Sequence, residues 1–306
     1  MVPHTADPPF SSRRPDFDSP SIFCRLLDKD KGGYFSISPP GELHCTTKQQ
    51  YLPSSCILQT RYIHEDGVVD LVDFFPRPKS ARVMTRGGHG QGSYREATKV
   101  QEELKKWLVR RVECMRGALT LDVEIFPAFD YARKSHETTL LRDRHAAGAA
   151  GSKVATFRSE DEGLQLDVAI EQGGEEEEEN DVTGAANITS SSKGGGGRDG
   201  DGDGDGDGAK RSNCPAIVFK KVRKPGLLGE GLVARIRIRE GQTVSFVLRR
   251  DAADHVTRDI TSLVLDSQQH DTQRFWFDFV SQSKYKGRWM EVVTRSLMIL
   301  KMLTYG

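Results

Sequence analysis

The chain has 306 residues, with 44 lysines and arginines and 44 aspartates and glutamates, so its formal net charge is zero. A balanced charge excludes the strong overall basicity that draws a protein to nucleic acid or to an anionic membrane surface. The five cysteines are scattered without a C-x-x-C spacing, which argues against a zinc site of that type and indicates free thiols in a reducing compartment.

The N-terminal residues 1–15 are rich in proline and serine and lack the apolar segment of a secretory signal. We expect them to form a disordered tail. No stretch of the sequence approaches the run of about 20 apolar residues that a membrane-spanning helix needs. These features predict a cytoplasmic protein without a membrane or nucleic-acid partner.

Alternation of apolar and polar residues, the period of a β-strand with one buried face, runs through much of residues 16–270. A first pair of strands, 56–63 and 68–74, flanks the hairpin signal Glu65-Asp66-Gly67. A later pair, 232–239 and 244–248, is joined by a second turn. Many short strands separated by turns are typical of an antiparallel β-sandwich, so the sequence predicts a mainly β domain here.

A segment of low complexity interrupts these strands between residues 173 and 212. It holds five consecutive glutamates, four consecutive glycines and five Asp-Gly pairs, with almost no apolar side chains to bury. We expect a disordered insertion within the domain. The Asp-Gly repeat does not reproduce a calcium-binding loop, because Lys210, Ser212 or Cys214 stands where a glutamate ligand is required. No metal site is predicted.

Helical spacing replaces the strand pattern in residues 271–306. We expect one helix capped near Asp271 or Thr272, and then a final helix. Apolar residues recur in the final helix at Trp289, Val293, Leu297, Leu300 and Leu303. Such a face must be buried, and few partners for it are present in the sequence. We therefore expect a second domain that begins here and is cut off, and self-association through Leu297, Leu300 and Leu303.

Short motifs occur in a fixed order along residues 16–170 and 214–305. They are DFDSPS (16–21), FCRLLD (23–28), DKGGYFSI (30–37), KQQYLP (48–53), EDGVV (65–69), DFFP (73–76), LVRRV (108–112), FDY (129–131) and YKGRW (285–289). This ordered set resembles the family 15 glycoside hydrolases, which comprise glucoamylase-like and trehalase-like enzymes.

The resemblance implies a supersandwich-like N-terminal domain over residues 16–270, followed in 271–306 by a linker helix and the first helix of an (α/α)6 catalytic barrel. It implies a parent enzyme that needs no cofactor and hydrolyses an α-glucosidic bond of trehalose or an α-glucan with inversion. The carbohydrate would bind in the barrel.

Inverting glycosidases use two carboxylates, one as acid and one as base. The resemblance implies that both lie beyond Gly306, so we expect no catalytic residue in this chain and no activity of its own. Four residues are candidates to lie near the substrate: Asp16 and Asp18, where the sandwich would meet the barrel mouth, and Arg288 and Trp289, at the barrel entrance. Structural alternatives are a cap on a short helix over 21–27 and packing of the linker against the sandwich.

Two other functions remain open at this point. The chain could be a stand-alone module that binds carbohydrate or protein through exposed tryptophans among Trp107, Trp276 and Trp289. It could also be a small glycosidase that uses Glu124 and Asp130. The sequence does not separate trehalose from maltooligosaccharides, because the residues that would contact the sugar are missing.

Overall fold

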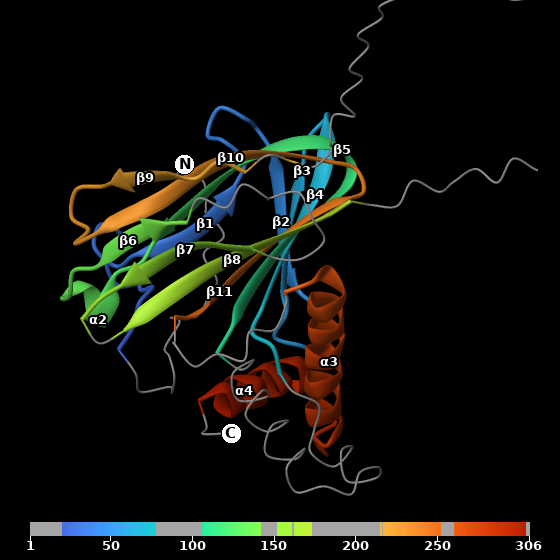
Figure 1. Ribbon diagram of the computed structural model, residues 1–306. Coiled ribbons are helices and arrows are strands. Elements are labelled where there is room, and N and C mark those ends of the chain that lie inside the picture. The colour runs from blue at the N-terminus through green and yellow to red at the C-terminus, as the bar shows by residue number, and fades with distance from the viewer. Residues whose placement is uncertain are drawn as a thin grey trace, which may run out of the picture. The chain divides into compact units, whose positions relative to one another are not determined.

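The computed structural model describes residues 20–77, 106–141, 152–160, 162–172, 215, 217–251 and 260–303. Eleven strands and three helices lie within these ranges (Figure 1). The strands are β1 (Tyr34–Ser38), β2 (Thr46–Tyr51), β3 (Leu58–Ile63), β4 (Gly67–Phe74), β5 (Leu108–Phe126), β6 (Glu137–Leu140), β7 (Ser152–Arg158), β8 (Gly163–Gln172), β9 (Lys220–Arg223), β10 (Glu230–Arg239) and β11 (Gln242–Arg250). The helices are α2 (Phe129–Ala132), α3 (Ser262–Ser281) and α4 (Met290–Met302).

The strands form two antiparallel layers that share β5. In the large sheet the order is β2-β3-β4-β5-β11-β8-β7-β6. In the small sheet the order is β1-β5-β10-β9. The first half of β5 pairs with β4 and β11, and its second half pairs with β1 and β10. The predicted antiparallel β-sandwich followed by a helical segment is confirmed.

Gly117 marks the point where β5 passes from one layer to the other. Its φ angle of 66° is in the left-handed region, which glycine adopts without strain. A Cβ atom at this position would lie 2.1 Å from the carbonyl oxygen of Asp66, in the turn between β3 and β4. A side chain would therefore push that hairpin away from the strand.

The main core lies between the two layers and follows from the strand period. In the second half of β5, Leu121, Val123 and Ile125 are fully buried, whereas Asp122 and Glu124 point to the other side. Inward residues from both layers complete one apolar cluster, among them Ile37, Leu71, Val112, Phe157, Leu166, Leu232, Ile236 and Phe246. Burial of this cluster drives the association of the sheets.

A second cluster lies on the opposite face of the large sheet, under α3. Leu265 of that helix packs with residues of β4, β5, β8 and β11, including Val72, Val109, Ala169 and Val247. Asp266 reaches Arg111 of β5 in an ion pair. The central strands of the large sheet are therefore buried on both faces, which is why Arg110 and Arg111 are both buried although they are neighbours in the chain.

Two helix predictions were wrong in detail. α3 begins at Ser262, where the Thr261 side chain accepts a hydrogen bond from the Val264 N–H, well before the predicted cap. Thr272 instead lies inside the helix and donates its hydroxyl to the Gln268 carbonyl. The short helix expected over 21–27 is a turn, and Asp28 accepts hydrogen bonds from the N–H groups of Asp30 and Lys31.

The helix predicted at the end of the sequence is present as α4. Met298 is its one fully buried residue, while Leu300 and Leu303 are 61% and 51% exposed. No helix in the described ranges is long and apolar enough to cross a membrane. The predicted tail 1–15 and the predicted insertion 173–212 lie outside the described residues, and the domain boundaries stay predictions.

Candidate functional site

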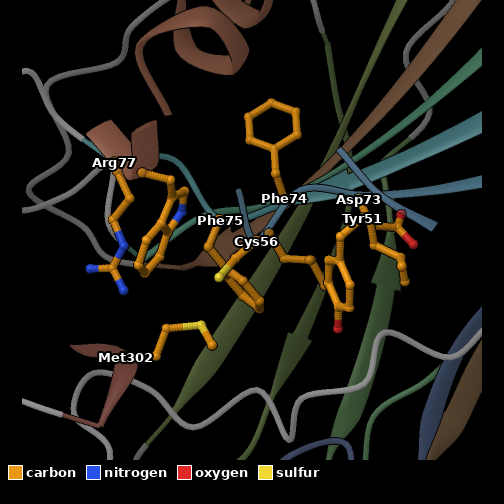
Figure 2. A pocket seen from close by; sticks show the side chains of 10 residues that line it. Tyr51, Cys56, Asp73, Phe74, Phe75, Arg77 and Met302 are labelled. Carbon is orange, nitrogen blue, oxygen red and sulfur yellow. The ribbon is translucent and has the colours of Figure 1, made fainter. Parts of the chain in front are cut away.

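A pocket opens where the ends of four strands of the large sheet meet α3 and α4 (Figure 2). The sheet and its loops contribute Tyr51, Cys56, Leu58, Asp73, Phe74, Phe75, Arg77 and Leu108, and the helices contribute Trp276 and Met302. Its empty volume is about 460 Å³, including space open to solvent. The lining is mainly apolar, with a few polar groups, as is typical of a small-molecule site.

Arg77 is held in this pocket by α3. β4 ends at Phe74, and the backbone N–H of Arg77 donates a hydrogen bond of 2.9 Å to the Thr272 hydroxyl. The guanidinium carbon lies 5.8 Å from the ring centre of Trp276 and 6.0 Å from that of Phe275, in reach of a cation–π attraction. The position of this cation is thus fixed by a helix far away in the sequence.

A second cation, Arg295 of α4, lies beside the pocket. Its Nη1 donates a hydrogen bond of 2.7 Å to the Ser55 carbonyl, in the loop between β2 and β3. Its guanidinium carbon lies 4.6 Å from the ring centre of Tyr51. Arg295 therefore attaches α4 to the rim of the pocket that β2 and its following loop form.

The thiol and the phenol of the pocket are both neutral at physiological pH. Burial raises the pKa of the Cys56 thiol to about 11, although the charges of Arg295 and Arg77 act in the opposite direction. Burial also raises the pKa of the Tyr51 hydroxyl. For the Arg77 guanidinium, burial lowers the pKa from an ordinary value so high that the group stays charged.

Asp73 is the acid among the described lining residues, and it is already paired. Its two carboxylate oxygens accept hydrogen bonds of 2.8 Å and 2.9 Å from Nε and Nη2 of Arg110. Arg110 is fully buried and also donates Nη1 to the Phe35 carbonyl of β1. Asp73 therefore serves the packing of the two sheets, and the pocket offers binding groups rather than a pair of carboxylates for acid–base chemistry.

The predicted site residues Arg288 and Trp289 are not among the described residues that line this pocket. Asp16 and Asp18 are outside the described residues. Arg288 and Trp289 lie together at the start of α4, where the guanidinium carbon is 5.2 Å from the indole ring centre. The structural alternative predicted that Trp289 packs the linker against the sandwich. Trp289 is instead 60% exposed.

The tryptophan platform considered for a binding module is not formed as a group. Trp107 and Trp276 are 5% and 2% exposed, so Trp289 alone of the three is open to solvent. Trp107 lies in the cluster under α3, and Trp276 lines the pocket.

The two acids considered for a small glycosidase each have a cationic partner. Glu124, on the outer face of the small sheet, accepts hydrogen bonds from the Tyr34 hydroxyl at 2.7 Å and from the Lys224 ammonium at 3.0 Å. Asp130 in α2 accepts one of 2.7 Å from Arg133. In the described ranges no three His, Cys, Asp or Glu side chains are grouped so as to hold a metal ion.

Sequence reasoning missed Arg77, Cys56 and Arg295 as residues of a site. The motifs KQQYLP and DFFP were noted, and they end at or beside the pocket residues Tyr51 and Phe75. The available signal was an arginine three residues after the end of a buried strand, and a second arginine in a helix with many apolar residues.

The comparisons with known proteins concern the N-terminal part of the chain. Residues 12–93 match the family model described as "Trehalase-like, N-terminal". Trehalase 2 of Sulfolobus acidocaldarius is 52% identical over 62 residues, which are 20% of this chain and 10% of that protein. The trehalases of Thermoplasma acidophilum and Mycolicibacterium smegmatis are 30% and 31% identical over 119 and 118 residues.

The latter two alignments cover 39% of this chain and 17% of each relative, so the chain matches a small part of the length of its curated relatives. Residues 12–93, which match the family model, contain β1 to β4 and most residues that line the pocket. Residues 12–93 of this chain are therefore similar to a trehalase-like N-terminal domain.

Proposed function

We propose that this chain is the non-catalytic N-terminal domain of an inverting α-glucosidase that hydrolyses trehalose. The observation that carries the proposal is the match of residues 12–93 to the trehalase-like N-terminal domain, together with similarity to proteins named trehalase. These relatives favour trehalose over maltooligosaccharides as the substrate. The acid and the base would be supplied by a helical domain that follows the sandwich, and carbohydrate would bind there.

The two faces of α4 support its assignment as the first helix of an (α/α)6 barrel. One face holds Arg295 and Met298, which contact the sandwich side. The rest of the helix surface exposes Val292, Ile299 and Leu300. A helix that carries apolar residues on both faces is expected between two layers of protein rather than at a surface. Further barrel helices would cover the exposed face.

Arg288 and Trp289 are the residues of this chain that we propose near the substrate, together with Asp16 and Asp18. For Arg288 and Trp289, the support is their position at the start of α4 and the exposure of the indole ring beside the guanidinium group. An exposed aromatic face with a neighbouring donor suits a sugar, which presents both apolar C–H groups and hydroxyls.

A cytoplasmic location is also proposed, because Cys24, Cys45, Cys56 and Cys114 are all free thiols.

The test compares two proteins for release of glucose from trehalose. We expect the 306-residue chain alone to release none. A chimera in which this chain replaces the corresponding N-terminal domain of the Thermoplasma acidophilum trehalase is expected to be active. Before mutarotation, proton NMR should show α-glucose and β-glucose in equal amounts, because inversion changes the attacked ring to β and the leaving glucose stays α. An inactive chimera that is folded, as judged by circular dichroism, would contradict the proposal.

Two further results would favour the alternatives. Hydrolysis by the chain alone that is lost in Glu124→Gln would indicate a small glycosidase. Trehalose binding by the chain alone in calorimetry, lost in Trp289→Ala, would indicate a stand-alone carbohydrate-binding module, which the exposure of Trp289 makes worth testing.

A further inference from the structure

We propose that the pocket lined by Arg77 and Trp276 is a binding site for a small organic monocarboxylate with an apolar body. The site lies apart from Arg288 and Trp289, and the inference does not depend on the proposed glycosidase function. The inference rests on the positive charge of the pocket, on its apolar lining residues and on its position between the sheet and the helices.

The pocket carries a positive charge that no carboxylate of the described residues compensates. Seven other arginines of the domain are paired with carboxylates, namely Arg61, Arg110, Arg111, Arg133, Arg158, Arg235 and Arg249. Among the residues that the structure describes, no carboxylate forms an ion pair with Arg77 or Arg295. Arg77 is half-buried, and a guanidinium that is partly removed from water without a counter-ion among the described residues is costly, so a bound anion would lower the free energy of this site.

Nothing in the described lining competes with such an anion. The Asp73 carboxylate is occupied by both prongs of Arg110. Cys56 is a protonated thiol, because burial raises its pKa to about 11. The planar fork of an arginine matches the two oxygens of a carboxylate and can bind both at once. Arg77 is therefore the group that we expect to hold the carboxylate.

The walls select a ligand with an apolar body. Leu58, Phe75, Leu108, Trp276 and Met302 line the pocket, and Trp276 is 2% exposed. A small hydrated ion would leave these side chains uncovered, whereas an aromatic or branched aliphatic group would bury them. Figure 2 shows Met302 on the same side of the pocket as Arg77, with Tyr51 and Asp73 on the other. A guanidinium group beside apolar lining residues favours an organic acid over an inorganic anion.

The position of the pocket couples binding to the docking of the helices. Trp276 belongs to α3, Met302 belongs to α4, and the other lining residues belong to the sheet and its loops. A ligand that contacts all three binds the docked state and not the undocked state. It should therefore raise the melting temperature by mass action.

The experiment uses benzoate as the probe, titrated into the 306-residue chain by calorimetry and by thermal unfolding. Two controls separate the contributions: benzamide has the same body without the charge, and acetate has the charge without the body. We expect benzoate to bind and to raise the melting temperature. We expect benzamide and acetate each to bind at least about tenfold more weakly. Equal binding of benzamide and benzoate, or of acetate and benzoate, would overturn the proposal.

Variants then locate the site. Arg77→Gln should weaken benzoate binding by about tenfold or more, whereas Arg133→Gln should leave it unchanged, because Arg133 is exposed and pairs with Asp130 elsewhere. If Arg77→Gln does not fold, the ligand comparison on the unmodified chain still decides the question. Unchanged binding in a folded Arg77→Gln would place benzoate at another site and refute the assignment.

Discussion

Asp73 of β4 and Arg110 of β5 lie directly opposite each other and form a doubly hydrogen-bonded ion pair in the interior. Their side chains are 3% and 0% exposed. A second pair has the same cross-strand geometry at the surface of the small sheet, where Arg235 lies opposite Asp122 with both prongs engaged. The two pairs differ mainly in burial, which makes them a matched comparison.

Arg110→Met should strongly destabilise the domain. The substitution leaves the Asp73 carboxylate buried without its cation and removes a donor from the Phe35 carbonyl. Removal of one partner of a buried pair costs about 3–5 kcal/mol. Urea denaturation followed by circular dichroism measures the change. Arg235→Met is the control and should cost about 1 kcal/mol or less, because the pair it breaks is exposed to solvent. Equal effects of the two substitutions would contradict this account.

Gly117→Ala should destabilise the chain by at least about 2 kcal/mol, because it strains the left-handed backbone and forces a methyl group into the Asp66 carbonyl. Gly41→Ala is the matched control: a Cβ atom there meets nothing within 4 Å. We expect its unfolding free energy to stay within about 0.5 kcal/mol of the original. A Gly117→Ala protein as stable as Gly41→Ala would show that β5 does not need glycine at the junction of the sheets.

Cys56 should resist alkylation in the folded protein. Its pKa of about 11 lies about two units above the ordinary value of 9.0, so its thiolate fraction near pH 8 is about 100-fold lower. Mass spectrometry after iodoacetamide treatment, with and without urea, measures the rate at this residue. Rapid labelling of Cys56 in the native state would contradict the burial of the pocket.

The same pKa shift predicts a pH dependence of stability. Below about pH 9, Cys56 is protonated in both the folded and the unfolded chain, so it makes the full favourable contribution. Between about pH 9 and 11 the unfolded chain releases this proton first, and the free energy of unfolding must fall as the pH rises. Cys56→Ala removes this component. The difference between the two proteins in urea denaturation should therefore change across that interval and stay constant below it.

The exposed face of α4 should make the isolated chain self-associate. Leu300 and Leu303 are more than half exposed, and Leu297 is half-buried beside them. Sedimentation velocity should show association that grows with protein concentration. Leu300→Glu with Leu303→Glu should abolish it. Leu263→Glu, at a leucine of α3 that is even more exposed, should leave it unchanged. A chain that stays monomeric at all concentrations would argue against this surface as an interface.

The alternation of apolar and polar residues predicts a strand correctly where one face of that strand is buried. β10 and the second half of β5 have such a face, and both were found. The sequence identifies the first half of β5 only as a motif, because this central part of the large sheet is buried on both faces and Arg110 and Arg111 interrupt the alternation. Their charges are compensated by Asp73 and by Asp266, two partners that sequence spacing does not reveal.

The pocket could not be predicted for a related reason. Arg77 follows a predicted strand, but its backbone N–H is held by Thr272, 195 residues later in the chain. The predicted helix start near that threonine was wrong, so its inward face, with Trp276, was not recognised as a wall. A site whose parts come from strand ends and two late helices becomes visible only when the register and the helix faces are known.

The sharing of β5 between the two layers has a consequence for biosynthesis. This strand pairs with β1, which begins at Tyr34, and with β11, which ends at Arg250. The small layer cannot close its hydrogen bonds along β5 until the chain has been synthesised to Arg239, and the large layer cannot do so until Arg250. Contacts between such distant segments slow folding, because long loops must close first. We therefore expect the sandwich to form late and in a single step after translation of β11, rather than one sheet at a time on the ribosome.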